Sequence, residues 1–179
     1  MKYCCHCGAL VSLKIPTGDV LSRFVCDACE TIHYQNPKIV VGCLPEWDNH
    51  ILLCRRAIAP RIGFWTFPAG FMEQGESAEA AAARETLEEA EAEVQITSLH
   101  GVFSLPHVSQ VYLVFRGLLR RPDFGAGSES LESKLFDPEI IPWDELAFPV
   151  IQEALRRYVS DRRQGKFDVH LGTIASRAW

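Results

Sequence analysis

Three closely spaced glutamates are the residues best suited to chemistry in this chain. Glu85, Glu88 and Glu89 stand at i, i+3 and i+4, so on a helix their side chains share one face. Residues 73–93 contain eight glutamates and one cation, Arg84. Ion pairs within the segment therefore leave most of the negative charge unbalanced, and a divalent cation such as Mg²⁺, which prefers oxygen ligands, would relieve it. A solvated acidic helix face is the alternative interpretation of these glutamates.

Two CxxC pairs, separated by 18 residues, form the second candidate site. Their members are Cys4, Cys7, Cys26 and Cys29. Four thiolates in this arrangement suit a tetrahedral Zn²⁺, and residues 1–36 have too few apolar runs to fold without such a staple. Redox-active or disulfide pairs are the alternative. Cys5 and His6 lie inside the first pair and are expected to point away from the metal.

Length and composition limit the classes of protein to which the chain can belong. Its 179 residues suit one domain with a small added module, and 47% hydrophobic residues are enough for a core. The net charge of -5 argues against binding to a nucleic-acid duplex. No apolar run is long enough to span a membrane, and no secretion signal begins the chain. Cysteines grouped in tight pairs indicate a reducing compartment, so we expect a cytoplasmic protein.

The elements that must position the glutamates can be predicted from residue patterns. Runs rich in β-forming residues lie at 38–45, 51–56, 94–105, 108–119 and 134–140. The polar turn between the first two predicts a hairpin. Residues 57–76 are rich in proline and glycine, which predicts a loop with a short strand at Trp65–Phe67, and residues 120–130 predict a second loop.

Two helices are expected. Residues 77–93 lack glycine and proline and are rich in strong helix formers, with Ser77 as a plausible N-cap. Residues 149–163 place apolar side chains on one stripe of an amphipathic helix. The last dozen residues show no clear pattern. Strands around one central helix, with a second helix at the end, predict a mixed sheet between helices.

The segment around the first helix resembles the Nudix box. That motif has glycine, five residues, glutamate, seven residues, and then R-E-U-x-E-E-x-G-U, where U is apolar or a small stand-in. The chain supplies Gly70, Glu76, Arg84, Glu85, Thr86, Glu88, Glu89 and Ala92 at these places. Two departures are Glu91 at the second glycine and Ala69 at a common glycine before the box. Relative to glycine, a glutamate at the helix end is expected to lower stability by up to about 1 kcal/mol or to lengthen the helix.

The resemblance implies a fold and a set of ligands. The fold class is α+β, a Nudix-type α/β/α sandwich with a mixed sheet, with a zinc ribbon at 1–36, the hydrolase domain at 37–165 and a tail at 166–179. Glu85, Glu88 and Glu89 would hold Mg²⁺ or Mn²⁺ and act in catalysis. Gly70 would permit a tight turn beside the metal, and Glu76 would pair with Arg84. The general base would be a box glutamate or one of two in a later loop, Glu129 and Glu132, for which a plain polar loop is the alternative.

The resemblance also suggests a substrate class. An N-terminal ribbon is similar to the subgroup of NADH pyrophosphatases and FAD or ADP-ribose pyrophosphatases. The chain has FSLPHVSQ at 103–110 where the NADH enzymes carry SQPWPFPxS, so it looks more like the FAD/ADP-ribose type. Arginines suit phosphate and aromatic rings suit a base. The candidates for substrate contact are Arg55, Arg56, Arg61, Trp65 and Phe67, although such aromatic residues are more often part of a core.

Three functions compete at this point. The first is Mg²⁺-dependent hydrolysis of the diphosphate bond in a nucleoside diphosphate linked to another moiety, with FAD or ADP-ribose as substrate. The second is hydrolysis of NADH or of a nucleotide-capped RNA end, but residues 1–38 hold four Lys/Arg against three Asp/Glu and offer little grip on RNA. The third is a non-catalytic nucleotide sensor, which is expected to have lost a box glutamate. We therefore expect a small-molecule nucleotide substrate and no membrane partner, and the charge disfavours nucleic acid as a partner. The family resemblance alone implies a homodimer.

The cysteine pattern makes a prediction about metal content. We expect the purified full-length chain to carry about one tightly bound Zn²⁺, as measured by elemental analysis after exhaustive dialysis. A zinc content near zero in folded protein would contradict the ribbon.

Overall fold

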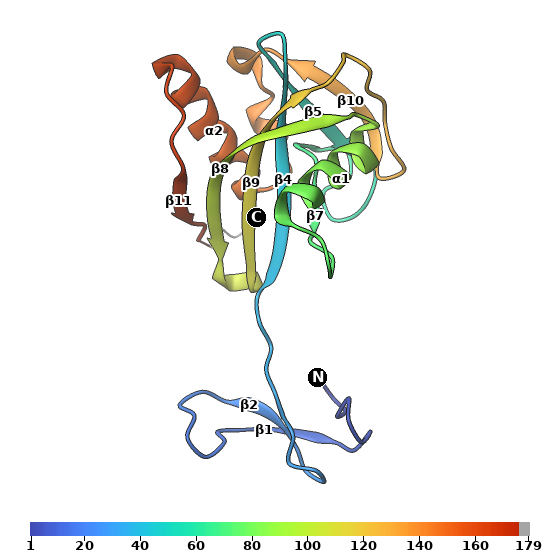
Figure 1. Cartoon of the computed structure of the whole chain (residues 1–179), viewed down its shortest axis with the longest axis vertical. Coiled ribbons are helices and arrows are strands. Elements are labelled where there is room, and N and C mark those ends of the chain that lie inside the picture. The colour runs from blue at the N-terminus through green and yellow to red at the C-terminus, as the bar shows by residue number, and fades with distance from the viewer. Residues whose placement is uncertain (176–179) are drawn as a thin grey trace. The chain divides into compact units, whose positions relative to one another are not determined.

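The chain folds into two compact units in the computed structural model, which describes residues 1–175 (Figure 1). The first unit is Met1–Pro37 and the second begins at Lys38. Within the described residues, no helix has both the length and the apolar character that a membrane span requires.

The first unit is a small antiparallel sheet with almost no core. Its strands are β1 (Val11–Lys14), β2 (Arg23–Cys26) and β3 (Ile32–His33), in that order. Cys4, Val25, Cys26 and His33 are its buried side chains. So small a core cannot offset the entropy of ordering the segment, which agrees with the need for a metal staple.

The second unit is built on a mixed sheet with strand order β10-β5-β4-β9-β8-β11. Its strands are β4 (Lys38–Trp47), β5 (His50–Arg56), β6 (Trp65–Thr66), β7 (Ala69–Phe71), β8 (Val94–Leu105), β9 (Gln110–Leu119), β10 (Ser130–Phe136) and β11 (His170–Thr173). The β4–β9 and β8–β11 pairs are parallel and the other pairs are antiparallel. Short strands β6 and β7 pair with β5 and β4. The hairpin predicted from the first two runs is confirmed by the pairing of Trp47 with His50.

Two helices cover opposite faces of this sheet (Figure 1). They are α1 (Ala78–Ala90) and α2 (Pro149–Gln164). Alternate residues of each strand point to opposite faces, so Leu52 packs in the core beneath α1 whereas Leu53 packs in the core beneath α2. Cys43 and Leu44 of β4 divide in the same way. The expected α+β sandwich with a mixed sheet is therefore confirmed.

The ends of α1 follow from its capping residues. At the start, Ser77 Oγ accepts a hydrogen bond from the Ala80 N–H at 3.2 Å, as an N-cap does. At the other end Glu91 adopts a left-handed conformation, φ 49° and ψ 30°, and its N–H donates to the Leu87 carbonyl. The helix expected to reach residue 93 therefore ends at Ala90. Glu91 has not lengthened the helix and accepts the conformation that glycine would take at lower cost.

Three other boundaries differ from the sequence-based expectation. Strand β9 begins at Gln110 because a short 3-10 turn, Pro106–Val108, links it to β8. Strand β10 covers Ser130–Phe136, and the following residues 138–140 form a second 3-10 turn. A third such turn is Trp143–Glu145. Strand β11 was not expected at all, because it is short and only its parallel register with β8 defines it.

The strain at Glu91 predicts a stabilising substitution. Glu91→Gly should raise the free energy of unfolding by about 1 kcal/mol, because glycine adopts positive φ without the Cβ clash. Urea denaturation of the zinc-bound full chain measures the change.

Glu91→Ala is the matched control, since it removes the same carboxylate but keeps the Cβ. It should give no comparable gain, and equal effects of the two substitutions would show that charge rather than backbone strain governs this helix end.

Candidate functional site

A cavity of about 990 Å³ opens in the second unit beside α1 and β7. Its polar lining includes Arg56, Glu73, Arg84, Glu85, Glu88, Glu89, His107, Gln110, Tyr112 and Glu129. The three glutamates with helical spacing thus reach one cavity, and Glu129 approaches it from the loop before β10. Its apolar wall includes Val40, Phe71, Leu105, Phe148 and Ile174. An acidic group of side chains beside an apolar wall is the usual composition of a small-molecule site.

The backbone of β7 sets the position of two of these carboxylates. Gly70 pairs with Val41 of β4, and a Cβ added at Gly70 would lie 2.4 Å from the Glu85 carboxylate. The neighbouring Ala69 N–H donates to Glu89 Oε2 at 3.2 Å. Glycine is therefore required at position 70 because the Glu85 carboxylate packs directly against its backbone.

Arg84 gathers three carboxylates around a single guanidinium. Its Nη1 lies 2.7 Å from Glu85 Oε1 and 2.9 Å from Glu88 Oε2. Its Nε and Nη2 donate to the two oxygens of Glu76 at 3.1 and 2.9 Å, and Nη2 also donates to the Phe71 carbonyl at 3.2 Å. The hydrogen bonds from Arg84 lower the pKa of Glu76. This network fixes the loop after β7 to α1 and orients two glutamates that face the cavity.

Burial changes the acidity of the two most enclosed glutamates. The pKa of Glu89 is raised to about 8, mainly by desolvation and in smaller part by the charges of Glu85 and Glu129, whereas the hydrogen bond from the Ala69 N–H lowers it. Desolvation also raises the pKa of Glu85, against the opposing hydrogen bond from Arg84. Because Glu85 and Glu89 are buried side by side and both resist ionising, an added cation between them would be stabilised.

The loop that carries Glu129 is anchored on the C-terminal end of α1. The Gly125 and Gly127 N–H groups donate to the carbonyls of Ala90 and Glu89, at 2.7 and 3.1 Å. A Cβ added at Gly127 would lie 1.7 Å from the Glu88 carbonyl oxygen, so only glycine allows the loop to approach this closely. These contacts satisfy carbonyls that a helix end leaves free.

The second loop glutamate has different surroundings. Glu132 lies in β10 opposite Arg55 of β5, and their charged groups are 3.9 Å apart. Among the described residues it is not part of the cavity lining. In contrast, the Glu129 carbonyl accepts a hydrogen bond from the Ala57 N–H at 2.8 Å, which holds this residue beside the cavity.

The three arginines considered for phosphate binding also differ in whether they line the cavity. Arg56 lines the cavity, and its guanidinium lies over the ring of Phe148 at 5.2 Å from the centroid. Arg55 donates from Nε to the Gly63 carbonyl at 2.8 Å. Within the described part of the chain, Arg55 and Arg61 lie outside the cavity lining. Arg56 is therefore the one of the three arginines that lines the cavity.

The two aromatic candidates belong to the core beneath α2. Trp65 contacts Phe136 edge to face with ring centroids 4.9 Å apart, and Phe67 is fully buried. The structure therefore agrees with the interpretation of these rings as core residues. Sequence reasoning did not select Tyr112 and Phe148, which line the cavity. Tyr112 reaches it because parallel pairing sets it opposite Val40, and no local pattern reveals that register.

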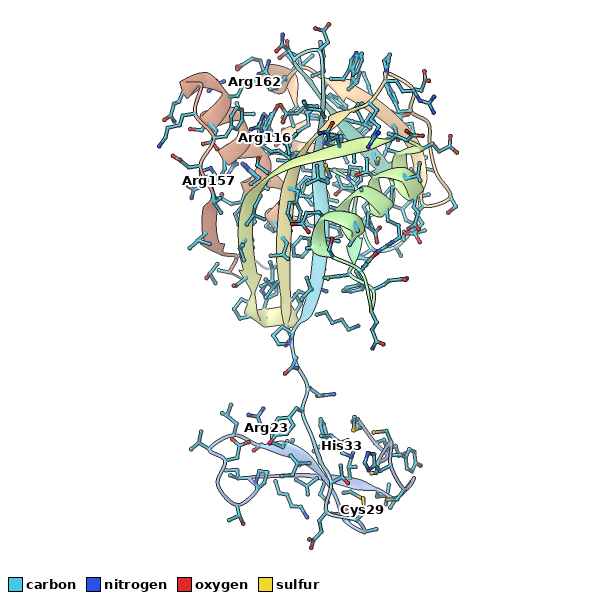
Figure 2. The ribbon with its side chains drawn as sticks, viewed as in Figure 1. Arg23, Cys29, His33, Arg116, Arg157 and Arg162 are labelled. Carbon is cyan, nitrogen blue, oxygen red and sulfur yellow. The ribbon has the colours of Figure 1, made fainter. Side chains whose placement is uncertain are left out.

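The four cysteines of the first unit come together as expected for a zinc ligand set. Their sulfur atoms all lie within 4.8 Å of one another, and Figure 2 shows sulfur atoms gathered near the labelled Cys29 and His33. His33 Nε2 lies 3.3 Å from Cys4 Sγ and its Nδ1 lies 3.7 Å from Cys5 Sγ. His6 contributes its backbone N–H to Cys4 Sγ at 3.4 Å. Four converging sulfurs fit a tetrahedral Zn²⁺.

Both units match models of known domain families. Residues 36–159 match the model described as NUDIX domain, and residues 2–35 match the zinc-ribbon model described as Nudix N-terminal.

Relatives and solved structures agree with these matches. An ADP-ribose pyrophosphatase from Methanocaldococcus jannaschii is 34% identical over 121 residues, which cover 64% of this chain and 69% of that protein. A NAD-capped RNA hydrolase from Vibrio vulnificus is 31% identical over 90% of this chain, which spans only 62% of that protein's length. The crystal structure of a NUDIX hydrolase from Nitrosomonas europaea has a TM-score of 0.95 and 56% identity, covering 98% of this chain and 100% of that one.

The raised pKa of Glu89 predicts how stability depends on pH. The prediction applies to protein in which the ribbon zinc is the only divalent cation. The unfolded carboxyl ionises near 4.5 and the folded one near 8, so the folded state holds the extra proton between these values. Stability therefore falls as pH rises through this window, by roughly 3 kcal/mol at neutral pH.

Glu89→Gln should remove this loss and be more stable than the parent at pH 7.5, as measured by urea denaturation across pH. Glu79→Gln, a change at an exposed position on the same helix, should leave the pH dependence intact. A parent whose stability does not fall from pH 5 to 8 would contradict the burial argument.

Proposed function

Because the chain belongs to the Nudix hydrolase family and is a pyrophosphatase of that family, we propose that it hydrolyses the diphosphate bond of FAD or ADP-ribose with the help of Mg²⁺. The observation that carries the proposal is the meeting of Glu85, Glu88, Glu89 and Glu129 at one cavity. The similarity to an ADP-ribose pyrophosphatase supports this choice of substrate class.

The donor atoms at this cavity fit a hard divalent cation. Glu85 and Glu89 are buried, with 8% and 7% of their surface exposed, and burial raises the pKa of both carboxyls. Glu88 is nearby on the more exposed edge of the same helix. All the ligand atoms are oxygens, as Mg²⁺ prefers, so we assign these three glutamates to hold it. When bound, the ion neutralises phosphate oxygens and lowers the pKa of a bound water.

Two further residues are assigned roles, one in proton transfer and one in orienting the glutamates. Hydrolysis requires a water to attack phosphorus and to lose a proton. We assign acceptance of that proton to Glu129, because its loop is fixed by backbone hydrogen bonds on both the α1 side and the Ala57 side. Arg84 keeps Glu85 and Glu88 oriented through charge-assisted hydrogen bonds.

Substrate contacts follow from the rest of the cavity wall. Arg56 lines the cavity, so we assign it to bind phosphate oxygens. Phe148 and Tyr112 offer flat faces on which a base or flavin ring can stack. A volume of about 990 Å³ is near the upper end of the roughly 300–1,000 Å³ typical of ligand sites, which suits a dinucleotide-sized molecule better than inorganic diphosphate.

Hydrolysis of a NAD-capped RNA end is a second candidate function. It is favoured by the 31% identity to a NAD-capped RNA hydrolase over 90% of this chain. The acidic net charge of -5 weighs against a long phosphate backbone as ligand.

A comparison of substrates tests the proposal. FAD, ADP-ribose, NADH, coenzyme A and NAD-capped RNA are incubated with Mg²⁺ and the full chain, and products are identified by mass spectrometry. We expect the highest kcat/KM for FAD or ADP-ribose, with AMP plus FMN or ribose phosphate as products. The highest kcat/KM for NADH or capped RNA would overturn this substrate assignment.

Glu88→Gln should lower kcat roughly 100-fold or more, since one cation ligand is lost while the side chain keeps its shape. Glu79→Gln is the matched control at the exposed start of α1 and should keep parental activity. Full activity in Glu88→Gln would show that the carboxylates of α1 do not hold the catalytic ion.

A further inference from the structure

A second group of metal-ligating side chains lies in the larger unit, outside the cavity lining. It comprises His100 of β8, Asp161 of α2 and His170 of β11, with one ligand atom from each lying within 4.8 Å of the others. The three residues come from three separate elements, and none of them belongs to the acidic site described above.

The buried histidine of this group has one ring nitrogen without a partner. His100 is 1% exposed, and its Nε2 lies 3.0 Å from the Ala154 carbonyl oxygen. A carbonyl oxygen only accepts, so Nε2 carries the hydrogen and Nδ1 carries the lone pair. Among the described residues, Nδ1 is buried and has no hydrogen-bond partner. A buried polar atom without a partner is costly, and it is the atom that a metal ion would need.

The other two residues are already close together. His170 Nε2 lies 2.7 Å from Asp161 Oδ2, and their side chains are 18% and 9% exposed. The rings of His100 and His170 are 5.2 Å apart at their centroids. His170 is the most exposed of the three, so it offers the side from which an ion can enter.

The charges around the group favour a cation. Asp161 supplies one negative charge, and the Nδ1 lone pair of His100 is available to an ion because the Nε2–H already donates to the Ala154 carbonyl. Lys166 acts on Asp161, and its ammonium is paired with Asp168 at 2.7 Å. The cation that acts on His100 is Arg116 of β9, labelled beside α2 in Figure 2. Its guanidinium is paired with Glu46 at 2.8 Å, which offsets its repulsion of an incoming ion.

We propose that His100, Asp161 and His170 form a second metal site that binds a divalent transition metal ion, with Zn²⁺ as the occupant. Two imidazoles and one carboxylate suit zinc better than Mg²⁺, which prefers oxygen alone. The hydrogen bond from His100 Nε2 to the Ala154 carbonyl is the support that metal-binding histidines generally have. For His170 to bind the ion through Nε2, the hydrogen on Nε2 would be released to solvent and Nδ1 would take up one from solvent, so that the imidazole stays neutral; a water would complete the tetrahedron.

Occupation of this site would fasten the last strand to the rest of the unit. His170 begins β11, whose parallel partner in β8 is Gly101 at that register. The same strand leads to Ile174, whose N–H donates to the Ser104 carbonyl at 2.8 Å and whose side chain lines the cavity. The ion would therefore brace one wall of the cavity without touching the reacting groups.

Calorimetric titration of Zn²⁺ into the full chain tests the proposal. The protein is first loaded at its cysteines, and excess Mg²⁺ is kept present to fill the oxygen ligands of α1. We expect about one further equivalent of Zn²⁺ to bind and the melting temperature to rise with it. His170→Gln should weaken this binding by roughly 100-fold, and Asp161→Asn should weaken it while preserving side-chain shape.

His50→Gln, a change in the β4–β5 hairpin, is the matched control and should bind the additional zinc like the parent. In crystals soaked with Zn²⁺, anomalous scattering should place an ion between the three side chains. Absence of a further equivalent in the parent would overturn the site, as would zinc binding that is unchanged in both His170→Gln and Asp161→Asn.

Discussion

The crowding of carboxylates around Arg84 is the constraint on which the larger unit's site depends. One guanidinium contacts Glu76, Glu85 and Glu88, while Glu89 is left to a single backbone N–H. Because Glu85 and Glu89 are buried, full ionisation of these glutamates is unfavourable unless a further cation is present. The protein tolerates this because core packing of α1 and pairing of β7 with β4 fix the backbone independently. Core packing and strand pairing elsewhere in the unit thus hold together a group of carboxylates that a cation would stabilise.

The far end of α1 illustrates how the same helix serves a second structural purpose. Its last carbonyls accept hydrogen bonds from Gly125 and Gly127, so the helix end becomes the seat of the loop that carries Glu129. Glu91 takes the left-handed position that closes the helix. The energetic cost of this conformation is offset by the hydrogen bonds from the loop. Those bonds would be lost if the helix ended at another residue. The position of Glu129 beside the cavity therefore depends on where the helix ends.

Local features of the site could be predicted from the sequence, whereas features set by distant pairing could not. The spacing of the three glutamates, the Ser77 cap and the cysteine pairs are short-range properties, and each fixes geometry within one element or between two adjacent turns. Which of Arg55, Arg56 and Arg61 lines the cavity depends on how β5, β6 and the loop between them fold together. Tyr112 reaches the cavity only through its register with β4, and β11 exists only as a partner of β8.

This division also bears on substrate preference. The carboxylates and their arginine come from one continuous segment, so they can be retained while the rest of the chain changes. The cavity wall comes from residues far apart in the sequence, including Val40, Tyr112, Phe148 and Ile174. Proteins described as an ADP-ribose pyrophosphatase and as a NAD-capped RNA hydrolase both resemble this chain. On the proposed function, the glutamates of the box would supply the bond-breaking chemistry, and the packing of the wall residues would select the molecule to be cut, because a shift of one strand register exchanges the lining side chains.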